Sequence, residues 1–224
     1  MTDSLPTLTI LEEFLLLALD DITGAFWPLS RSAFDNATAG AVIMDLMRLR
    51  RVDCDLHRLF VVNTLPTDDD ILDPVLQALA LEPVVGTRSI IDEVRFLGEE
   101  GEAFRERALQ RLIERGMIKR EDRKILWVFG ERCYPVDSDN PTLREVKARI
   151  LEAITGTTIP DIDTIMLVSL AEGCGLFTHV LNRPDLANAA PRIAAIGRMD
   201  LVGRAVATSI TELETAIAMS SGLR

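Results

Sequence analysis

Residues 9–27, TILEEFLLLALDDITGAFW, constrain the fold of this chain more than any other segment. Thr9 and Glu12 have the spacing of a capping box, in which a hydroxyl and a carboxylate satisfy the first free N–H groups of a helix. Residues 14–19 are apolar almost all round, which is typical of a helix buried at the centre of a bundle. This run is too short to cross a membrane, which takes about 20 apolar residues. Polar residues at 20–24 then predict a turn.

Composition favours one domain in a reducing cytoplasm. The chain has 224 residues and no stretch that resembles a linker, so we expect a single domain over residues 1–224. Its three cysteines, Cys54, Cys133 and Cys174, are widely spaced and odd in number, which argues against a disulfide framework. The formal net charge of −11 opposes general binding to nucleic acid. Any contact with phosphate must therefore be local.

The remaining pattern is mostly helical. Helices are expected at residues 38–49, 70–80, 89–97, 103–115, 142–154, 162–172, 176–181, 191–196 and 202–219. Hairpins are expected at 52–63 and 117–129, the second with its turn at 120–124. Prolines, Pro191 among them, are expected at or near helix ends. The sequence thus predicts a mainly α domain: a central buried helix surrounded by amphipathic helices, with two small β-hairpins in winged-helix-like units.

No residue pattern indicates catalysis. His57 and His179 each lack a ligand partner at metal-site spacing, and a lone histidine is more often a packed or surface residue. No nucleophile elbow, P-loop or dinucleotide fingerprint stands between a strand and a helix, and the glycines at 173–175 are better explained as a helix break. We therefore expect no enzymatic activity, no metal and no cofactor.

Arg105 is the first candidate for ligand binding. It opens a run at 105–124 that holds eight basic and four acidic residues, which is most simply a solvated helix face. On a helical wheel, however, Arg105 falls in the middle of the apolar face of the helix at 104–115. Because a guanidinium keeps its charge, it must meet either a carboxylate of the protein or an external anion such as a phosphate. The sequence leaves both possibilities open.

Two further candidates are apolar. Trp27 stands in a turn between Phe26 and Pro28, where it is either core filler or an interfacial anchor, since its ring is apolar and its N–H prefers water. The strand Ile125, Leu126, Trp127, Val128 and Phe129 is apolar on both faces. One face is expected to cover the core, and the other must meet another element, another subunit or lipid.

At these positions the chain resembles the Golgi phosphoprotein 3 family, which binds phosphatidylinositol 4-phosphate and has many bacterial members. The resemblance is carried by Leu8-Thr9-Ile10, Glu12-Glu13, the leucine run to Asp20-Asp21, Phe26-Trp27, residues 40–46 with Arg50-Arg51, Pro66-Thr67, residues 71–73, Arg105-Glu106-Arg107, residues 112–116, the hairpin at 125–129, and residues 165–171 with Leu181. It covers most of the chain and is closest to the bacterial type.

The resemblance implies a helical domain on the cytosolic face of a membrane that recognises a phosphoinositide headgroup. The family's tryptophan corresponds to Trp27, and the second of its paired arginines corresponds to Arg105. The first of that pair falls at Glu102, and another headgroup arginine falls at Ala39. Arg31, in the loop after Trp27, is a substitute for these missing arginines. The apolar hairpin implies membrane insertion or self-association.

The leading hypothesis is a peripheral membrane protein of the cytoplasm that binds phosphatidylinositol 4-phosphate or another anionic lipid through Trp27, Arg105 and Arg31. It acts as an adaptor, and a homo-oligomer would form through the hairpin at 125–129. One alternative is a soluble protein-interaction module without lipid binding, for which Arg105 is buried or paired with an acid. Another is a winged-helix nucleic-acid binder, for which Arg107, Arg111 and Arg115 project from one helix; the net charge argues against it.

Overall fold

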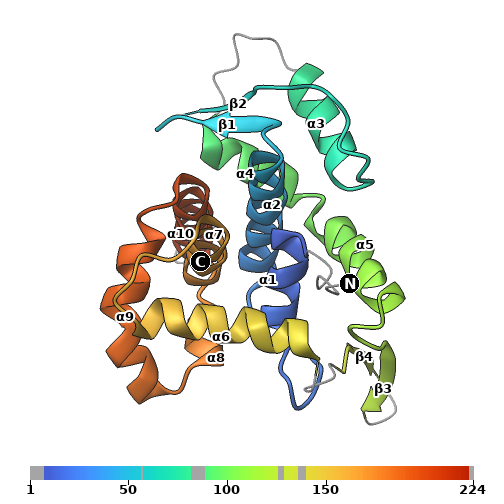
Figure 1. Cartoon of the computed structure of the whole chain (residues 1–224), viewed down its shortest axis with the longest axis vertical. Coiled ribbons are helices and arrows are strands. Elements are labelled where there is room, and N and C mark those ends of the chain that lie inside the picture. Colours follow the sequence, from blue (N-terminus) through green and yellow to red (C-terminus); the bar gives the residue numbers. More distant parts are fainter. Residues whose placement is uncertain (1–7, 57, 82–88, 126–128, 136–139, 222–224) are drawn as a thin grey trace, which may run out of the picture.

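The computed structural model describes residues 8–56, 58–81, 89–125, 129–135 and 140–221, and within them the protein is mainly helical (Figure 1). The helices are α1 (Ile10–Ala18), α2 (Arg31–Arg48), α3 (Leu72–Leu81), α4 (Ile90–Gly98), α5 (Gly101–Glu114), α6 (Pro141–Thr155), α7 (Ile162–Gly173), α8 (Phe177–Val180), α9 (Arg183–Gly197) and α10 (Leu201–Ser221). The strands are β1 (Val52–Cys54), β2 (Leu59–Val61), β3 (Glu121–Ile125) and β4 (Phe129–Cys133). The predicted fold class is confirmed.

Helix α1 lies at the centre of the domain, as its sequence predicts. All its residues are buried, and α2, α5, α6 and α7 pack around it (Figure 1). The capping box is formed: the backbone N–H of Glu12 donates to Thr9 Oγ1 at 3.1 Å, and that of Thr9 donates to Glu12 Oε2 at 3.0 Å. Helix α1 is short, but packing against the neighbouring helices stabilises it more than its intrinsic helix propensity does.

Acidic side chains fix this helix to its neighbours. Glu12, which is fully buried, pairs with Arg115 of the α5 end at 3.1 Å, and Glu13 pairs with Arg149 of α6. From α2, the carboxylate of Asp45 accepts the first two backbone N–H groups of α1, at 2.7 and 3.1 Å. Burial nevertheless raises the pKa of Asp45 to about 7, because desolvation outweighs these two donors. The acidic pair at 12–13 is therefore structural.

Helices α7 and α10 approach each other closely because glycine stands at their crossing. A Cβ on Gly203 would lie 2.4 Å from Ser169 Cβ and 3.0 Å from the Ser169 carbonyl carbon. A Cβ on Gly173 would likewise lie 3.0 Å from the Gly203 carbonyl oxygen. The absence of side chains at these two positions lets the backbones touch.

The two hairpins follow α2 and α5, which confirms the predicted helix-then-hairpin order. Val52 pairs with Val61 in the first, and Glu121 pairs with Cys133 in the second. The turn predicted at 120–124 was wrong, because residues 121–125 form β3. A two-stranded ribbon need not bury either face, so its strands need not alternate between apolar and polar residues. The polar sequence of β3 therefore resembled a turn.

Two helix predictions need correction. Helix α2 begins at Arg31 rather than at 38, with Ser30 Oγ accepting the backbone N–H of Ala33 at 3.2 Å, so Arg31 belongs to a helix and not to a loop. Pro191 lies inside α9, not at its end. The carbonyl that loses its partner there belongs to Ala187, an exposed residue, and water can satisfy it. In the described residues no helix is long and apolar enough to span a bilayer.

Candidate functional site

Arg105 lies on the inner face of α5, as its place on the helical wheel predicts, and its side chain is only 11% exposed. Its guanidinium carbon sits 4.3 Å from the ring centre of Phe34, in the geometry of a cation–π contact. Nη1 donates a hydrogen bond to Thr38 Oγ1 at 3.2 Å. The carboxylate that the buried charge requires is supplied by Asp35, whose Oδ1 lies 2.7 Å from Arg105 Nη1.

Arg31 converges on the same carboxylate from the start of α2. Its Nε lies 3.5 Å from Asp35 Oδ2, and its Nη2 lies 3.2 Å from Glu102 Oε2 on α5. The Arg31 side chain is 80% exposed and that of Glu102 is 63% exposed. We call Arg31, Asp35, Glu102 and Arg105 the arginine–carboxylate cluster. Its two cations and two anions balance, so the cluster carries no formal net charge.

The contact between Asp35 and Arg105 is electrostatic rather than a well-directed hydrogen bond. The Nη1 donor is aimed at Thr38, and no described residue donates a correctly oriented hydrogen bond to the buried Asp35 Oδ1. Asp35 is therefore held by charge while one of its oxygens lacks the hydrogen bonds that usually compensate for burial.

Glycines bring the two helices of the cluster together. A Cβ on Gly101 would lie 2.9 Å from the Cα of Asp35, and one on Gly98, at the end of the preceding α4, would lie 2.5 Å from Asn36 Oδ1. The α5 N-terminus therefore rests directly on α2, which places Glu102 and Arg105 beside Asp35. Sequence reasoning missed Asp35 and Phe34. The available signal was the i,i+4 spacing of Arg31 and Asp35, which is typical of a helical ion pair.

Trp27 has a separate set of contacts. Its ring stacks on that of His179 in α8, with centroids 6.4 Å apart and planes 16° from parallel. Its backbone N–H donates to the Ala18 carbonyl at 2.9 Å, which ties the α1–α2 connection to the end of α1. The link to the cluster is indirect: the neighbouring Phe26 packs against Phe34, the ring beneath Arg105, at 4.9 Å. The Phe26–Phe34 pair thus links the segment that holds Trp27 to Arg105.

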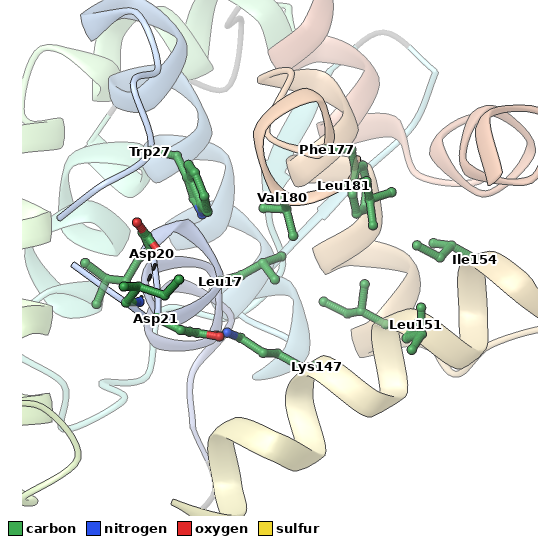
Figure 2. Close-up of a pocket in the computed structure, with 13 residues that line it drawn as sticks. Leu17, Asp20, Asp21, Trp27, Lys147, Leu151, Ile154, Phe177, Val180 and Leu181 are labelled. Atoms are coloured by element: carbon green, nitrogen blue, oxygen red, sulfur yellow. Dashed lines mark hydrogen bonds and ion pairs between the residues drawn. The ribbon is translucent and has the colours of Figure 1, made fainter. Parts of the chain in front are cut away.

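The half-buried Trp27 borders an apolar pocket of about 400 Å³. Figure 2 shows Trp27 and Val180 on one side of this pocket and Leu151 and Ile154 of α6 on the other. Ile22 and Leu151 at its edge are 89% and 55% exposed. The pocket is lined by residues 17, 19–22 and 27, by Lys147, Ile150, Leu151 and Ile154, and by Phe177, Val180 and Leu181.

The acidic pair at the edge of this pocket forms the predicted turn. Asp20 Oδ1 accepts the backbone N–H of Ile22 at 3.0 Å and Oδ2 accepts the hydroxyl of Thr23 at 2.8 Å; these donors lower the pKa of Asp20. Asp21 pairs with Lys147. Both carboxylates thus have structural roles, as the sequence indicated.

Three arginines of the basic run after Arg105 make internal contacts. Arg111 binds Asp69 at 2.8 Å and also Asp70, and Arg115 binds Glu12. Arg107 donates to the Asp70 carbonyl at 3.1 Å. A nucleic-acid interface that projects these three arginines therefore has no support. The described residues contain no group of histidine, cysteine and carboxylate side chains suited to a metal ion.

The apolar strand predicted at 125–129 is divided in the structure, because Ile125 ends β3 and Phe129 begins β4. Ile125 pairs with Phe129 in the backbone register. Leu126, Trp127 and Val128 lie outside the described residues. The predicted roles of residues 125–129 in membrane insertion or self-association stay predictions.

Position 39 supplies no donor to any of these sites. The Ala39 side chain is fully buried within the packing of α2. Arg31 and Arg105 are therefore the arginines that the fold brings together near the α2–α5 junction.

Comparisons with known proteins agree with the fold. A relative from Schizosaccharomyces pombe, named vacuolar protein sorting-associated protein 74, is 24% identical over 174 residues, which is 69% of this chain. The match spans 50% of the length of that relative. The family model described as Golgi phosphoprotein 3 (GPP34) matches residues 10–213, from the first residue of the central helix into α10. This chain is a member of the Golgi phosphoprotein 3 (GPP34) family.

Proposed function

We propose that this protein is a non-enzymatic, peripheral membrane protein that binds an anionic lipid headgroup at the arginine–carboxylate cluster. The observation that carries the proposal is the convergence of Arg31 and Arg105 on the single carboxylate of Asp35. Two guanidinium groups that flank one carboxylate place two positive charges where a phosphate could bind. Family membership and the named relative's role in vacuolar protein sorting are consistent with work at a membrane.

The surrounding backbone favours an anion at the same place. Arg31 occupies the first turn of α2, and Glu102 occupies the first turn of α5, so the positive ends of two helix dipoles lie near the cluster. The exposed Arg31 makes first contact, and the more enclosed Arg105 provides a charge that cannot be neutralised. Phosphatidylinositol 4-phosphate, whose phosphomonoester carries more negative charge than a phosphodiester, fits this arrangement.

Two arginines alone give weak attachment. A basic residue near an anionic membrane contributes about 1 kcal/mol, so the two arginines contribute at most about 2 kcal/mol, which Asp35 and Glu102 oppose and salt weakens. The hairpin at 125–129 is the proposed second anchor, since its apolar residues would add burial in the lipid. Trp27 supports the site through Phe26 and Phe34 rather than by touching the headgroup.

Vesicle co-sedimentation tests the proposal. Wild type, Arg31→Ala and Arg105→Ala would be mixed with vesicles of phosphatidylcholine alone, or with added phosphatidylglycerol or phosphatidylinositol 4-phosphate, at low and high salt. We expect binding to the phosphatidylinositol 4-phosphate vesicles, weakened about fivefold by Arg31→Ala, which corresponds to the loss of about 1 kcal/mol. Equal binding to the phosphatidylglycerol and phosphatidylinositol 4-phosphate vesicles would show that the protein is attracted by charge and does not select a headgroup.

A second candidate is a protein-interaction module without lipid binding. The ion pair between Asp35 and Arg105 favours it, since an internal carboxylate already satisfies the buried cation. The apolar pocket beside Trp27, with Ile22 and Leu151 exposed at its edge, is the surface such a module would use. Wild type that binds no vesicle of any composition would make this second candidate the better account.

A further inference from the structure

We propose that Asp35 is an internal competitor for the headgroup site, occupying the two arginines as a phosphate would and setting the affinity of the site. The inference rests on the proposed function, because it assigns a regulating residue to the same cluster. Its chemistry is general: any phosphomonoester dianion, lipid-borne or free, would compete with one carboxylate for the same guanidinium donors.

The position of Asp35 is that of a bound ligand. One of its oxygens faces Arg105 at 2.7 Å and the other faces Arg31 at 3.5 Å, so the carboxylate bridges the two cations. The side chain is 16% exposed, which leaves this bridge open to solution on the side of Arg31. A phosphate that enters from this side meets the exposed arginine first and the enclosed one second.

The bridge is also imperfect, which makes it replaceable. Asp35 Oδ1 accepts no directed hydrogen bond from the described residues, although it is buried. Arg105 directs its Nη1 donor to Thr38 instead. A phosphate brings more acceptor oxygens than a carboxylate and a larger negative charge, so it can satisfy donors that Asp35 leaves poorly used.

Glu102 is a weaker, outer competitor. Among the described residues its ion pair is with the exposed Arg31, at 3.2 Å, and an ion pair between exposed side chains contributes about 0–1 kcal/mol. Its removal should therefore release less affinity than removal of the charge on Asp35. A general charge effect does not predict this order, because removal of the more exposed Glu102 would then increase the affinity at least as much.

The expected gain follows from occupancy. If Asp35 holds the arginines about nine-tenths of the time, the competent fraction is about one-tenth, and freeing the site tightens apparent binding about tenfold. Asp35→Asn keeps the side-chain shape and removes the charge. Asp185→Asn in α9 is the matched control, since it changes the net charge equally and Asp185 bonds only locally with Asn182. In Figure 1, α9 and α5 lie on opposite sides of the molecule.

The experiment measures binding of wild type, Asp35→Asn, Glu102→Gln and Asp185→Asn to vesicles containing phosphatidylinositol 4-phosphate. We expect about tenfold tighter binding for Asp35→Asn, a smaller gain for Glu102→Gln and no change for Asp185→Asn. The gain should be lost in Asp35→Asn/Arg31→Ala, in which the second substitution is at a side chain that is 80% exposed. Thermal unfolding of each variant verifies that it is folded.

The outcomes separate the two proposals. Equal gains for all three acid variants would overturn the competitor role and show a net-charge effect. Wild-type binding that depends on Arg31 but is unchanged by Asp35→Asn would overturn the competitor role and leave the proposed function standing. No binding of any variant to vesicles or to inorganic phosphate would overturn both. Stabilisation of Asp35→Asn by inorganic phosphate without vesicle binding would support the competitor role toward a free phosphate and overturn the membrane role.

Discussion

Replacing Gly203 with alanine should separate α7 from α10 and destabilise the domain. The new Cβ would lie 2.4 Å from Ser169 Cβ and 3.0 and 3.1 Å from the Ser169 carbonyl carbon and oxygen. Carbon atoms in contact normally lie about 3.5–4.0 Å apart, so the two helices must move by about 1 Å. Because two of these neighbours are backbone atoms, no side-chain rotation relieves the clash.

The magnitude follows from two opposing effects. Overpacking of a core costs about 1–3 kcal/mol, and the rigid backbone neighbours place this site at the upper end. Alanine recovers about 1 kcal/mol of helix propensity relative to glycine. The expected net loss in the free energy of unfolding is about 2 kcal/mol. In a chain of this size that loss lowers the melting temperature by about 4–8 °C.

Urea unfolding followed by circular dichroism and fluorescence measures this loss. The control is Gly197→Ala at the end of α9, where a Cβ would lie 3.5 Å from Glu172 Cγ, an ordinary contact, so stability should be unchanged or slightly higher. Gly203→Ala that is as stable as wild type, with an unchanged m value, would refute the close-packing argument for this crossing.

Three further predictions concern buried ionisable groups. Arg115→Met strands the fully buried Glu12 without its ion pair and should lower the free energy of unfolding by about 2 kcal/mol, measured by urea titration at neutral pH. Because burial raises the pKa of Asp45 to about 7, the stability linked to its protonation is full below about pH 4 and is lost as pH rises through about 7. Asp45→Asn should therefore lose less stability than wild type between pH 5 and pH 8 in thermal melts; an identical loss would contradict the assignment. Burial also raises the pKa of the Cys174 thiol to about 12 and that of Cys54 to about 11, so native-state alkylation at pH 8, followed by mass spectrometry, should leave Cys174 unmodified until the protein unfolds.

The central helix and the helix break were predictable because their signals are local. Thr9 and Glu12 lie in one turn, and the apolar run that follows has no polar face to place in water. Gly175 adopts a φ of +75° just after α7, which is the conformation that ends helices. Such features depend on neighbouring residues and can be deduced before any tertiary structure is known.

The arginine–carboxylate cluster was only half predictable. The wheel placed Arg105 on a buried face and required a partner, but it gave no means of choosing Asp35 among the chain's 35 acidic residues. That choice depends on how α5 rests on α2 at Gly101, a contact between segments far apart in the sequence. Arg31 was expected in a loop because α2 begins with polar residues. The local signal that a helix starts there is the capping residue Ser30.

The burial of α1 has a consequence for synthesis of the protein on the ribosome. This helix is synthesised before the helices that cover it, α2, α5, α6 and α7, and α7 ends at Gly173. At about 5–20 residues per second, the apolar segment waits roughly 10–30 s for its last neighbour. The leucine-rich segment therefore stays partly uncovered, and accessible to chaperones, until α7 has been synthesised.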